Sequence, residues 1–331
     1  MKKSIYFNGE KMKIIKFGGT AFQTPKLVDN VVNLIKKEEK PLIVVVSAIG
    51  RKGFPFATDT LIDSIKESYL SKKEMDRLLS LGEIYSTLFL SNSLNKNEIK
   101  AYALSYLECG IETNENYGEG NIISLNDENH LKYFKEYDVL VVPGFIGSTG
   151  SKEVITLGRG TSDLTAVELA RLHKEKEVIL YKEVDGIYPT LFANLNRLKT
   201  YDFLSYNQVK ALIKIGFNIV NEKAILEAEK DNISIKIKNF TINENETLIS
   251  LKESKNKVLG FNVDNNVVKV ATFFGEEIKK ELIEIFKQYH IYVKEEDNEI
   301  DYFSFKISNS QLLLIRQILL ITYFFDMLMW K

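Results

Sequence analysis

Short apolar runs alternate with helical patterns along most of this 331-residue chain, and this alternation restricts the possible folds more than any other feature. Four of the runs are expected to be strands, and "PLIVVVSA" is apolar enough to be buried on both faces of a parallel sheet. The four runs are "MKIIKF", "PLIVVVSA", "DVLVVPGF" and "EVILYKEV". Helical patterns cover residues 26–39, 59–69, 73–92 and 164–173. We therefore predict an α/β fold in which helices cover both faces of a largely parallel sheet.

A polar stretch from residue 239 to residue 257 interrupts this pattern and predicts a connection between two domains. The segment after it reads as a strand, a helix, two strands and a helix, an order typical of a small α+β sandwich of ferredoxin-like type. We expect a large domain over residues 1–250 and a small domain over residues 251–331.

The C-terminal stretch Leu312–Trp330 is strongly apolar, but Arg316, Gln317 and Asp326 interrupt it. A charge at the centre of a bilayer is costly, so we expect a buried helix followed by the last strand of the small domain. A membrane anchor and an exposed patch used for dimerisation are the alternatives. The N-terminal segment lacks the apolar stretch of a signal peptide.

Composition excludes several classes of function. The formal net charge is −1 and the lysines and glutamates are interspersed, so no basic face for nucleic acid is expected. The single cysteine, Cys109, rules out an internal disulfide and most cysteine-based metal sites, which fits a reducing cytoplasm. The three histidines, His130, His173 and His290, form no recognisable metal or acid–base pattern, and we predict no metal site within the protein itself.

The first strand delivers Lys16 directly into the turn Gly18-Gly19-Thr20. Unobstructed glycine amides can form a nest for anionic oxygens, and a lysine adds a point charge. Ordinary turn chemistry is the alternative explanation. The pattern is neither the Walker motif nor the dinucleotide-binding motif.

Three further segments carry polar residues at expected strand ends or helix starts. Ser47 ends a buried strand and Thr58 stands at a helix start, where a strand terminator and a helix cap are the simpler interpretations. Glu83 lies among leucines in a helical segment, which predicts a buried partner such as a substrate ammonium group.

The third segment, "TLGRGTSD", opens a helix. Ser162 or Asp163 can cap that helix, and Arg159 can grip a carboxylate through two hydrogen bonds.

These segments, with "VVPGFIG" and "VDGIYPT", resemble the amino acid kinase family, and "GRGTSD" resembles aspartate kinase within it. The resemblance runs from about Met12 to Ser250, with an ACT-like segment after it. It implies a three-layer αβα sandwich followed by a single ACT-like domain of ferredoxin-like fold. It also implies transfer of the γ-phosphoryl group of ATP, with Mg²⁺, to the side-chain carboxylate of L-aspartate. That reaction opens the aspartate-family pathway to lysine or diaminopimelate, threonine and methionine.

The resemblance also implies roles for residues. Lys16 and Asp163 would be catalytic, with Asp163 orienting Lys16 or the metal. Arg159 would hold the α-carboxylate of aspartate and Glu83 its ammonium group. The residues that would complete the substrate pocket are Ser47, Thr58 and Ser162. The residues that would bind the nucleotide are Lys16, Gly18, Gly19, Thr20, Val184, Asp185, Gly186 and Tyr188. A cytoplasmic homodimer is the expected form.

The chain departs from the family pattern mainly on the nucleotide side. Lys182 and Glu183 stand where the family has Thr-Asp, and Ala193 stands near the place of an arginine, with Arg197 further on. Asn218 stands where the family has a lysine that meets nucleotide phosphate. Ala21 and Thr161 replace a serine and a glycine beside the substrate loops.

Two alternative functions follow from these departures. The chain could be a catalytically weak homologue that binds an amino acid or a partner chain, or a kinase for a related amino-carboxylate. Aspartate kinases typically carry two ACT repeats, whereas we expect about one here, so feedback inhibition by lysine or threonine is not expected.

Overall fold

The computed structural model describes residues 12–65, 69–191, 198–241 and 245–327. The chain divides into two compact units, of which the first comprises residues 1–185 and 226–244 and the second comprises residues 186–225 and 245–331. The second unit thus takes in residues 186–225, so the division between the units differs from the expected boundary after residue 250.

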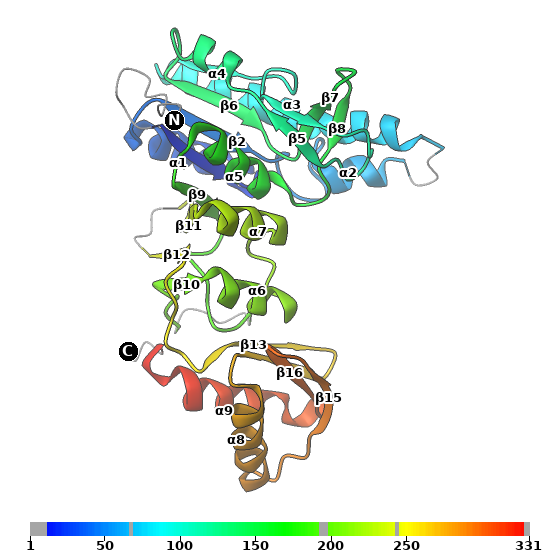
Figure 1. Ribbon diagram of the computed structural model, residues 1–331, viewed down its shortest axis with the longest axis vertical. Coiled ribbons are helices and arrows are strands. Elements are labelled where there is room, and N and C mark those ends of the chain that lie inside the picture. The colour runs from blue at the N-terminus through cyan, green and yellow to red at the C-terminus, as the bar shows by residue number, and fades with distance from the viewer. Residues whose placement is uncertain (1–11, 66–68, 192–197, 242–244, 328–331) are drawn as a thin grey trace. The chain divides into compact units, whose positions relative to one another are not determined.

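The first unit is built on a sheet of six parallel strands in the order β11-β9-β1-β2-β6-β3 (Figure 1). These strands are β1 (Lys13–Phe17), β2 (Leu42–Val46), β3 (Ala101–Ala103), β6 (Val139–Pro143), β9 (Glu177–Lys182) and β11 (Ser234–Asn239). The four strands predicted from apolar runs are β1, β2, β6 and β9, which lie side by side at the centre. Every residue of β2 and β6 is buried, because helices cover both faces.

The helices of the first unit are α1 (Pro25–Lys37), α2 (Thr58–Asp63), α3 (Lys72–Lys96), α4 (Glu128–Tyr133), α5 (Ser162–His173) and most of α7 (Glu222–Asp231), with a 3-10 turn η1 (Gly19–Phe22). Helices α1 and α3 pack on one face of the sheet, against a core that includes Ile15, Phe17 and Val44. Helix α5 contacts β1, β2 and β9 and contributes no residue to that core, so it covers the other face.

A second, smaller sheet in the first unit has the order β5-β4-β7-β8. Its strands are β4 (Ile111–Thr113), β5 (Ile122–Leu125), β7 (Ile146–Thr149) and β8 (Val154–Thr156). Buried Asp76 of α3 connects that helix to this sheet. Its carboxylate accepts hydrogen bonds from the Thr156 hydroxyl at 2.7 Å, the Thr156 amide at 3.1 Å and the Gly118 amide at 2.9 Å.

The second unit contains a parallel pair, β10 (Phe203–Ser205) and β12 (Glu246–Ser250), and helix α6 (Tyr206–Lys214). Strand β12 falls within the stretch that we expected to be a connection, so part of that stretch is ordered sheet instead. An antiparallel sheet follows, in the order β13-β14-β16-β15. It is formed by β13 (Val258–Asp264), β14 (Val267–Thr272), β15 (Lys294–Asn298) and β16 (Tyr302–Lys306), with α8 (Gly275–Gln288), η3 (Asn309–Gln311), α9 (Leu312–Phe324) and η4 (Phe325–Met327).

The expected final strand of the small domain is wrong in the part that the structure describes, because residues 312–327 form α9 and η4. The physical reason lies at the other end of the domain. Strand β13 pairs antiparallel with β14 and occupies the edge that a last strand would take in a ferredoxin-like sheet.

The C-terminal segment packs as a helix with Ile315, Ile318 and Leu319 buried. Within the described residues, the helical segment Asn309–Met327 is also long and apolar enough to cross a membrane by length and composition.

Candidate active site

The carboxyl ends of β1, β2, β6 and β9 meet at one edge of the sheet, because these strands are parallel. Ligands in sheets of this kind bind in the loops at that edge. The loops that leave β1, β2 and β9, together with the start of α5, bring most of the predicted residues together there. All of the residues discussed below belong to the first unit unless stated otherwise.

A buried charge cluster stands at the centre of this edge. Lys16 Nζ lies 2.9 Å from Asp163 Oδ1, and Lys182 Nζ lies 2.9 Å and 2.7 Å from Oδ1 and Oδ2 of the same carboxylate. The exposed fractions of the three side chains are 7% for Lys16, 4% for Asp163 and 17% for Lys182. The predicted association of Lys16 with Asp163 is therefore present in the structure, and Lys182 joins it.

The cluster sets the ionisation of its members. Burial alone would raise the pKa of Asp163, but the charges and hydrogen bonds of Lys16 and Lys182 hold that pKa well below its usual range. Burial lowers the pKa of Lys182 to about 8; the Asp163 carboxylate opposes this shift, and the charge of Lys16 adds to it. Asp163 is thus a fixed anion between two cations.

The turn after β1 has one glycine that packing requires and one that it does not. A Cβ on Gly19 would lie 1.8 Å from the carbonyl oxygen of Ala48, so only glycine fits. Gly18 has a φ of −72° and no heavy atom within 4 Å of a built Cβ. Among the described residues, no turn or loop hydrogen bond has the Gly18 or Gly19 amide as its donor. The turn therefore has the open space that an anionic ligand needs to approach the backbone.

Ser47 and Ser162 meet although 115 residues separate them. Ser47, directly after β2, donates a hydrogen bond from its hydroxyl to the Ser162 hydroxyl oxygen at 3.0 Å. Gly144 permits this approach, because a Cβ there would lie 2.6 Å from the Ser162 Cβ. The first residue of α5, next to Asp163, is thus fixed against the loop that follows β2.

Glu83 is buried in the middle of α3, as its position among leucines predicted. Its Oε1 accepts a hydrogen bond from the Ala48 amide at 3.1 Å, whereas its Oε2 is buried without a hydrogen-bond partner among the described residues. Burial raises the pKa of Glu83 to about 8, although the Ala48 amide and the charge of Lys16 act in the opposite direction. A buried carboxylate oxygen without a partner is the feature expected of a site that receives a cationic ligand group.

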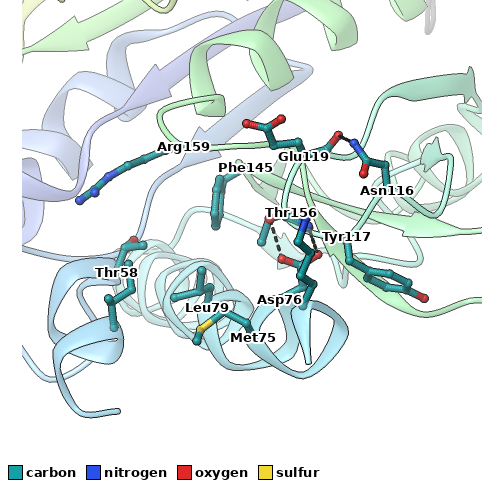
Figure 2. Close-up of a pocket in the computed structure, with 13 residues that line it drawn as sticks. Thr58, Met75, Asp76, Leu79, Asn116, Tyr117, Glu119, Phe145, Thr156 and Arg159 are labelled. Carbon is teal, nitrogen blue, oxygen red and sulfur yellow. Dashed lines mark hydrogen bonds between the residues drawn. The ribbon is translucent and has the colours of Figure 1, made fainter. Parts of the chain in front are cut away.

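Arg159 and Thr58 line the same end of a pocket of about 350 Å³ (Figure 2). Asp76 and Tyr117 lie toward its other end, and Phe145 and Leu79 form part of the wall between. The Arg159 guanidinium donates to the carboxylate of Asp59, the second residue of α2. The guanidinium has five N–H donors, so this contact leaves others for a ligand carboxylate.

The residues predicted to bind the nucleotide are divided between the two units. Thr20 lies in η1, and Val184 and Asp185 follow β9, where Asp185 Oδ1 accepts a hydrogen bond from Asn239 at 2.7 Å. Gly186 and Tyr188 belong to the second unit. At Gly186 a Cβ would lie 2.5 Å from Thr247 Oγ1, so packing alone explains that glycine. Their roles toward a nucleotide stay predictions.

Sequence reasoning missed the contribution of Lys182, which it counted only as a departure from a family pattern. The signal was present in its position, since a lysine that ends a buried strand next to β1 must reach the same edge as Lys16. Asp59 was also missed as the partner of Arg159.

Ala193 and Arg197 lie outside the described residues. Among the residues that the structure describes, no group of three or more His, Cys, Asp or Glu could hold a metal ion.

Comparisons with known proteins agree with the resemblance drawn from the motifs. Residues 11–239 match the model of the amino acid kinase family. The chain is 29% identical over 279 residues to the aspartokinase of Geobacillus stearothermophilus, covering 82% of this chain and 67% of that protein. It is 31% identical over 250 residues to aspartokinase 1 of Bacillus subtilis, covering 73% of this chain and 62% of that protein.

The fold is similar to that of a solved structure of E. coli aspartokinase III in complex with aspartate and ADP (R-state). The TM-score is 0.63 and the identity 18%, over 92% of this chain and 83% of that one. The predicted fold class and the predicted resemblance to aspartokinases are both confirmed.

Replacement by alanine should change the stability of the protein differently at the two glycines of the turn after β1. We expect Gly19→Ala to lower the free energy of unfolding by about 3 kcal/mol or more, because the Ala48 carbonyl cannot give way without distorting the next loop. Gly18→Ala is the matched control and should leave stability within about 0.5 kcal/mol. Thermal denaturation of both variants checks this, and equal losses would contradict the packing that we describe.

Proposed function

Because the chain belongs to the amino acid kinase family, we propose that it transfers the γ-phosphoryl group of ATP to the side-chain carboxylate of L-aspartate, giving 4-phospho-L-aspartate and ADP. One observation carries the proposal. Lys16, paired with Asp163, is a buried cation suited to a phosphoryl group. Glu83 has a buried oxygen suited to an ammonium group. The contact between Ser47 and Ser162, together with the Ala48 amide that donates to Glu83, connects these two parts of the site. The site thus offers a cation to the phosphoryl group and a buried carboxyl oxygen to the ammonium group.

The acceptor would be held by its α-amino and α-carboxylate groups. Glu83 would accept hydrogen bonds from the ammonium group, and Arg159, with Thr58 beside it, would bind the α-carboxylate. Ser47 precedes Ala48, whose amide donates to Glu83, and Ser162 precedes Asp163, which holds the lysines; their two hydroxyls would orient the reacting carboxylate. The similar E. coli aspartokinase III was solved in complex with aspartate and ADP, which supports aspartate and an adenine nucleotide as ligands here.

The reaction requires no general base. An aspartate side chain has a pKa near 3.9 and is ionised at neutral pH, so its oxygen can attack the γ-phosphorus directly. The bond from the γ-phosphorus to the β–γ bridging oxygen breaks, and ADP leaves with the electron pair. The difficulty is that one anion approaches another, and Lys16 with the Gly18 and Gly19 amides would stabilise the charge on the transferring oxygens.

Mg²⁺ would arrive with the nucleotide. It usually keeps several waters and binds through substrate phosphates and one or two carboxylates, and the described residues provide no cluster that would hold it alone. When bound, it supplies further neutralisation of phosphate charge. No step above depends on a particular metal ligand.

A hydroxylamine trap tests the function directly. With ATP, Mg²⁺ and L-aspartate the full chain should form aspartyl hydroxamate, and Lys16→Ala should lower kcat by at least about 100-fold, because the cation at the γ-phosphoryl group is lost. Lys13→Gln is the matched control, since Lys13 lies on the same strand but pairs with Glu38 and Glu39. If no hydroxamate forms with aspartate, the proposal fails; product with another amino-carboxylate alone would reassign the substrate.

The ionisation of Glu83 predicts how aspartate binding depends on pH. With a pKa of about 8, Glu83 is mostly neutral at pH 6.5 and must lose its proton to hold an ammonium group. The KM for L-aspartate should therefore fall roughly tenfold as pH rises from 6.5 to 8. In Glu83→Gln the KM should be high and nearly independent of pH over this range. A flat profile in the unmodified chain would show that Glu83 does not bind the ammonium group.

We also propose that residues 251–331 form a single ACT-like domain through which a cytoplasmic homodimer assembles. The sheet order β13-β14-β16-β15, in which β13 stands where a ferredoxin-like domain has its last strand, supports this. Light scattering of the full chain should give twice the mass of the 331-residue chain. A monomer at micromolar concentration would contradict this part of the proposal without affecting the proposed reaction.

A further inference from the structure

Lys182 contributes a second ammonium group to the buried edge where Lys16 stands. We propose that Lys182 is a catalytic residue of this chain, which binds the transferring phosphoryl group together with Lys16 while Asp163 holds both ammonium groups in place. The inference rests on the phosphoryl transfer proposed above. It concerns a residue at which this sequence departs from the family pattern.

The sheet register places the two lysines on one face. Lys16 pairs with Leu180 in the parallel ladder between β1 and β9. Side chains alternate along a strand, so Lys182, two residues after Leu180, points to the same face as Lys16. That face is covered by α5, whose second residue is Asp163, and the three charged groups converge there.

The cluster contains more positive charge than its own structure needs. Asp163 already has a partner in Lys16 at 2.9 Å, so Lys182 leaves the site with one excess positive charge. Glu183, the next residue, does not offset it there, because its carboxylate pairs with Arg51. Glu83 is mostly neutral near pH 7, since burial raises its pKa to about 8.

Holding an unneutralised cation in a buried site costs stability, and a threonine or a methionine at this position would avoid the cost. An anionic ligand that binds there would neutralise this excess positive charge. The Lys182 side chain is 17% exposed, against 7% for Lys16, so a ligand at the carboxyl edge can reach it. Two contacts to Asp163 use two of its three N–H donors and leave the third for a phosphoryl oxygen.

The role of Lys182 in the step is electrostatic. The aspartate oxygen forms its bond to the γ-phosphorus as the bond to the β–γ bridging oxygen breaks, and ADP takes the electron pair. Charge spreads over the three equatorial oxygens, where Lys16 and Lys182 donate hydrogen bonds. Both lysines keep their protons throughout, and Asp163 stays ionised.

Replacing Lys182 with a neutral residue tests whether Lys182 takes part in catalysis or has only a structural role. In Lys182→Met, kcat should fall about 100-fold while the KM for L-aspartate changes less than about threefold, because Lys182 does not contact the amino acid. The thermal midpoint should not fall and should rise by up to a few degrees, since Asp163 keeps Lys16 and the excess buried charge is removed. Lys182→Gln serves as a second neutral variant if the methionine variant does not fold, and Lys13→Gln is the matched control.

A binding measurement separates contact with the γ-phosphate from other effects. By calorimetry, the unmodified chain should bind the β,γ-imido analogue of ATP about tenfold or more tightly than ADP. Both neutral variants should lose most of this preference while their affinity for ADP stays within about threefold. Lys182→Arg should retain part of it, because it keeps the charge.

Three results would overturn the inference, and they are distinguishable. If the unmodified chain is active and the neutral variants keep both its kcat and its preference for the ATP analogue, Lys182 is not catalytic and the proposed function stands. If the neutral variants lose activity only with a large fall in thermal midpoint and an unchanged preference, Lys182 is structural. An unmodified chain that forms no hydroxamate overturns the inference together with the proposed function.

Discussion

The contact of Lys16 and Lys182 with Asp163 is the interaction on which the rest of the site depends. Charged groups can be buried at this edge only because each has an opposite charge within about 3 Å. That arrangement requires β1 and β9 to be parallel neighbours and α5 to begin above them. The cations are fixed before any ligand binds, so no energy is needed to orient them during a reaction. The fold therefore supplies the electrostatics of phosphoryl transfer through the order of its strands.

The opposite ionisation of the two buried carboxyl groups gives the site its polarity. Asp163, between two ammonium groups, has a pKa held below its usual range, whereas Glu83, with one amide donor and one oxygen without a partner, has a pKa of about 8. When the environments of two titratable groups push their pKa values apart, the two groups commonly have different roles in a site. Here the division separates the part suited to phosphate from the part suited to an ammonium group. The contact between Ser47 and Ser162 connects the two parts.

The second unit shows how a small fold can be completed from either end of its chain. A ferredoxin-like sheet has an edge next to its first strand, and here β13, which precedes that strand, takes the edge. The C-terminal residues are then not needed as a strand, and their apolar side chains pack as α9 instead. This explains why the pattern of one strand, one helix and two strands was predicted correctly while the last element was not.

By itself the sequence determined the central strands and the chemical positions at their ends. A run such as β2, apolar at every position, fits a strand buried on both faces, and the segments that contain Lys16, Glu83 and Asp163 resemble the family whose model matches residues 11–239. Only the tertiary structure showed that Lys182 contacts Asp163, because this contact depends on where α5, which carries Asp163, begins over the sheet. It also decided that Arg159 pairs with Asp59 and that β13 fills the edge in the second unit. The physical reason is common to these cases: periodicity along a chain reports which faces are buried, whereas the partner of a charge or a strand edge is set by segments distant in sequence.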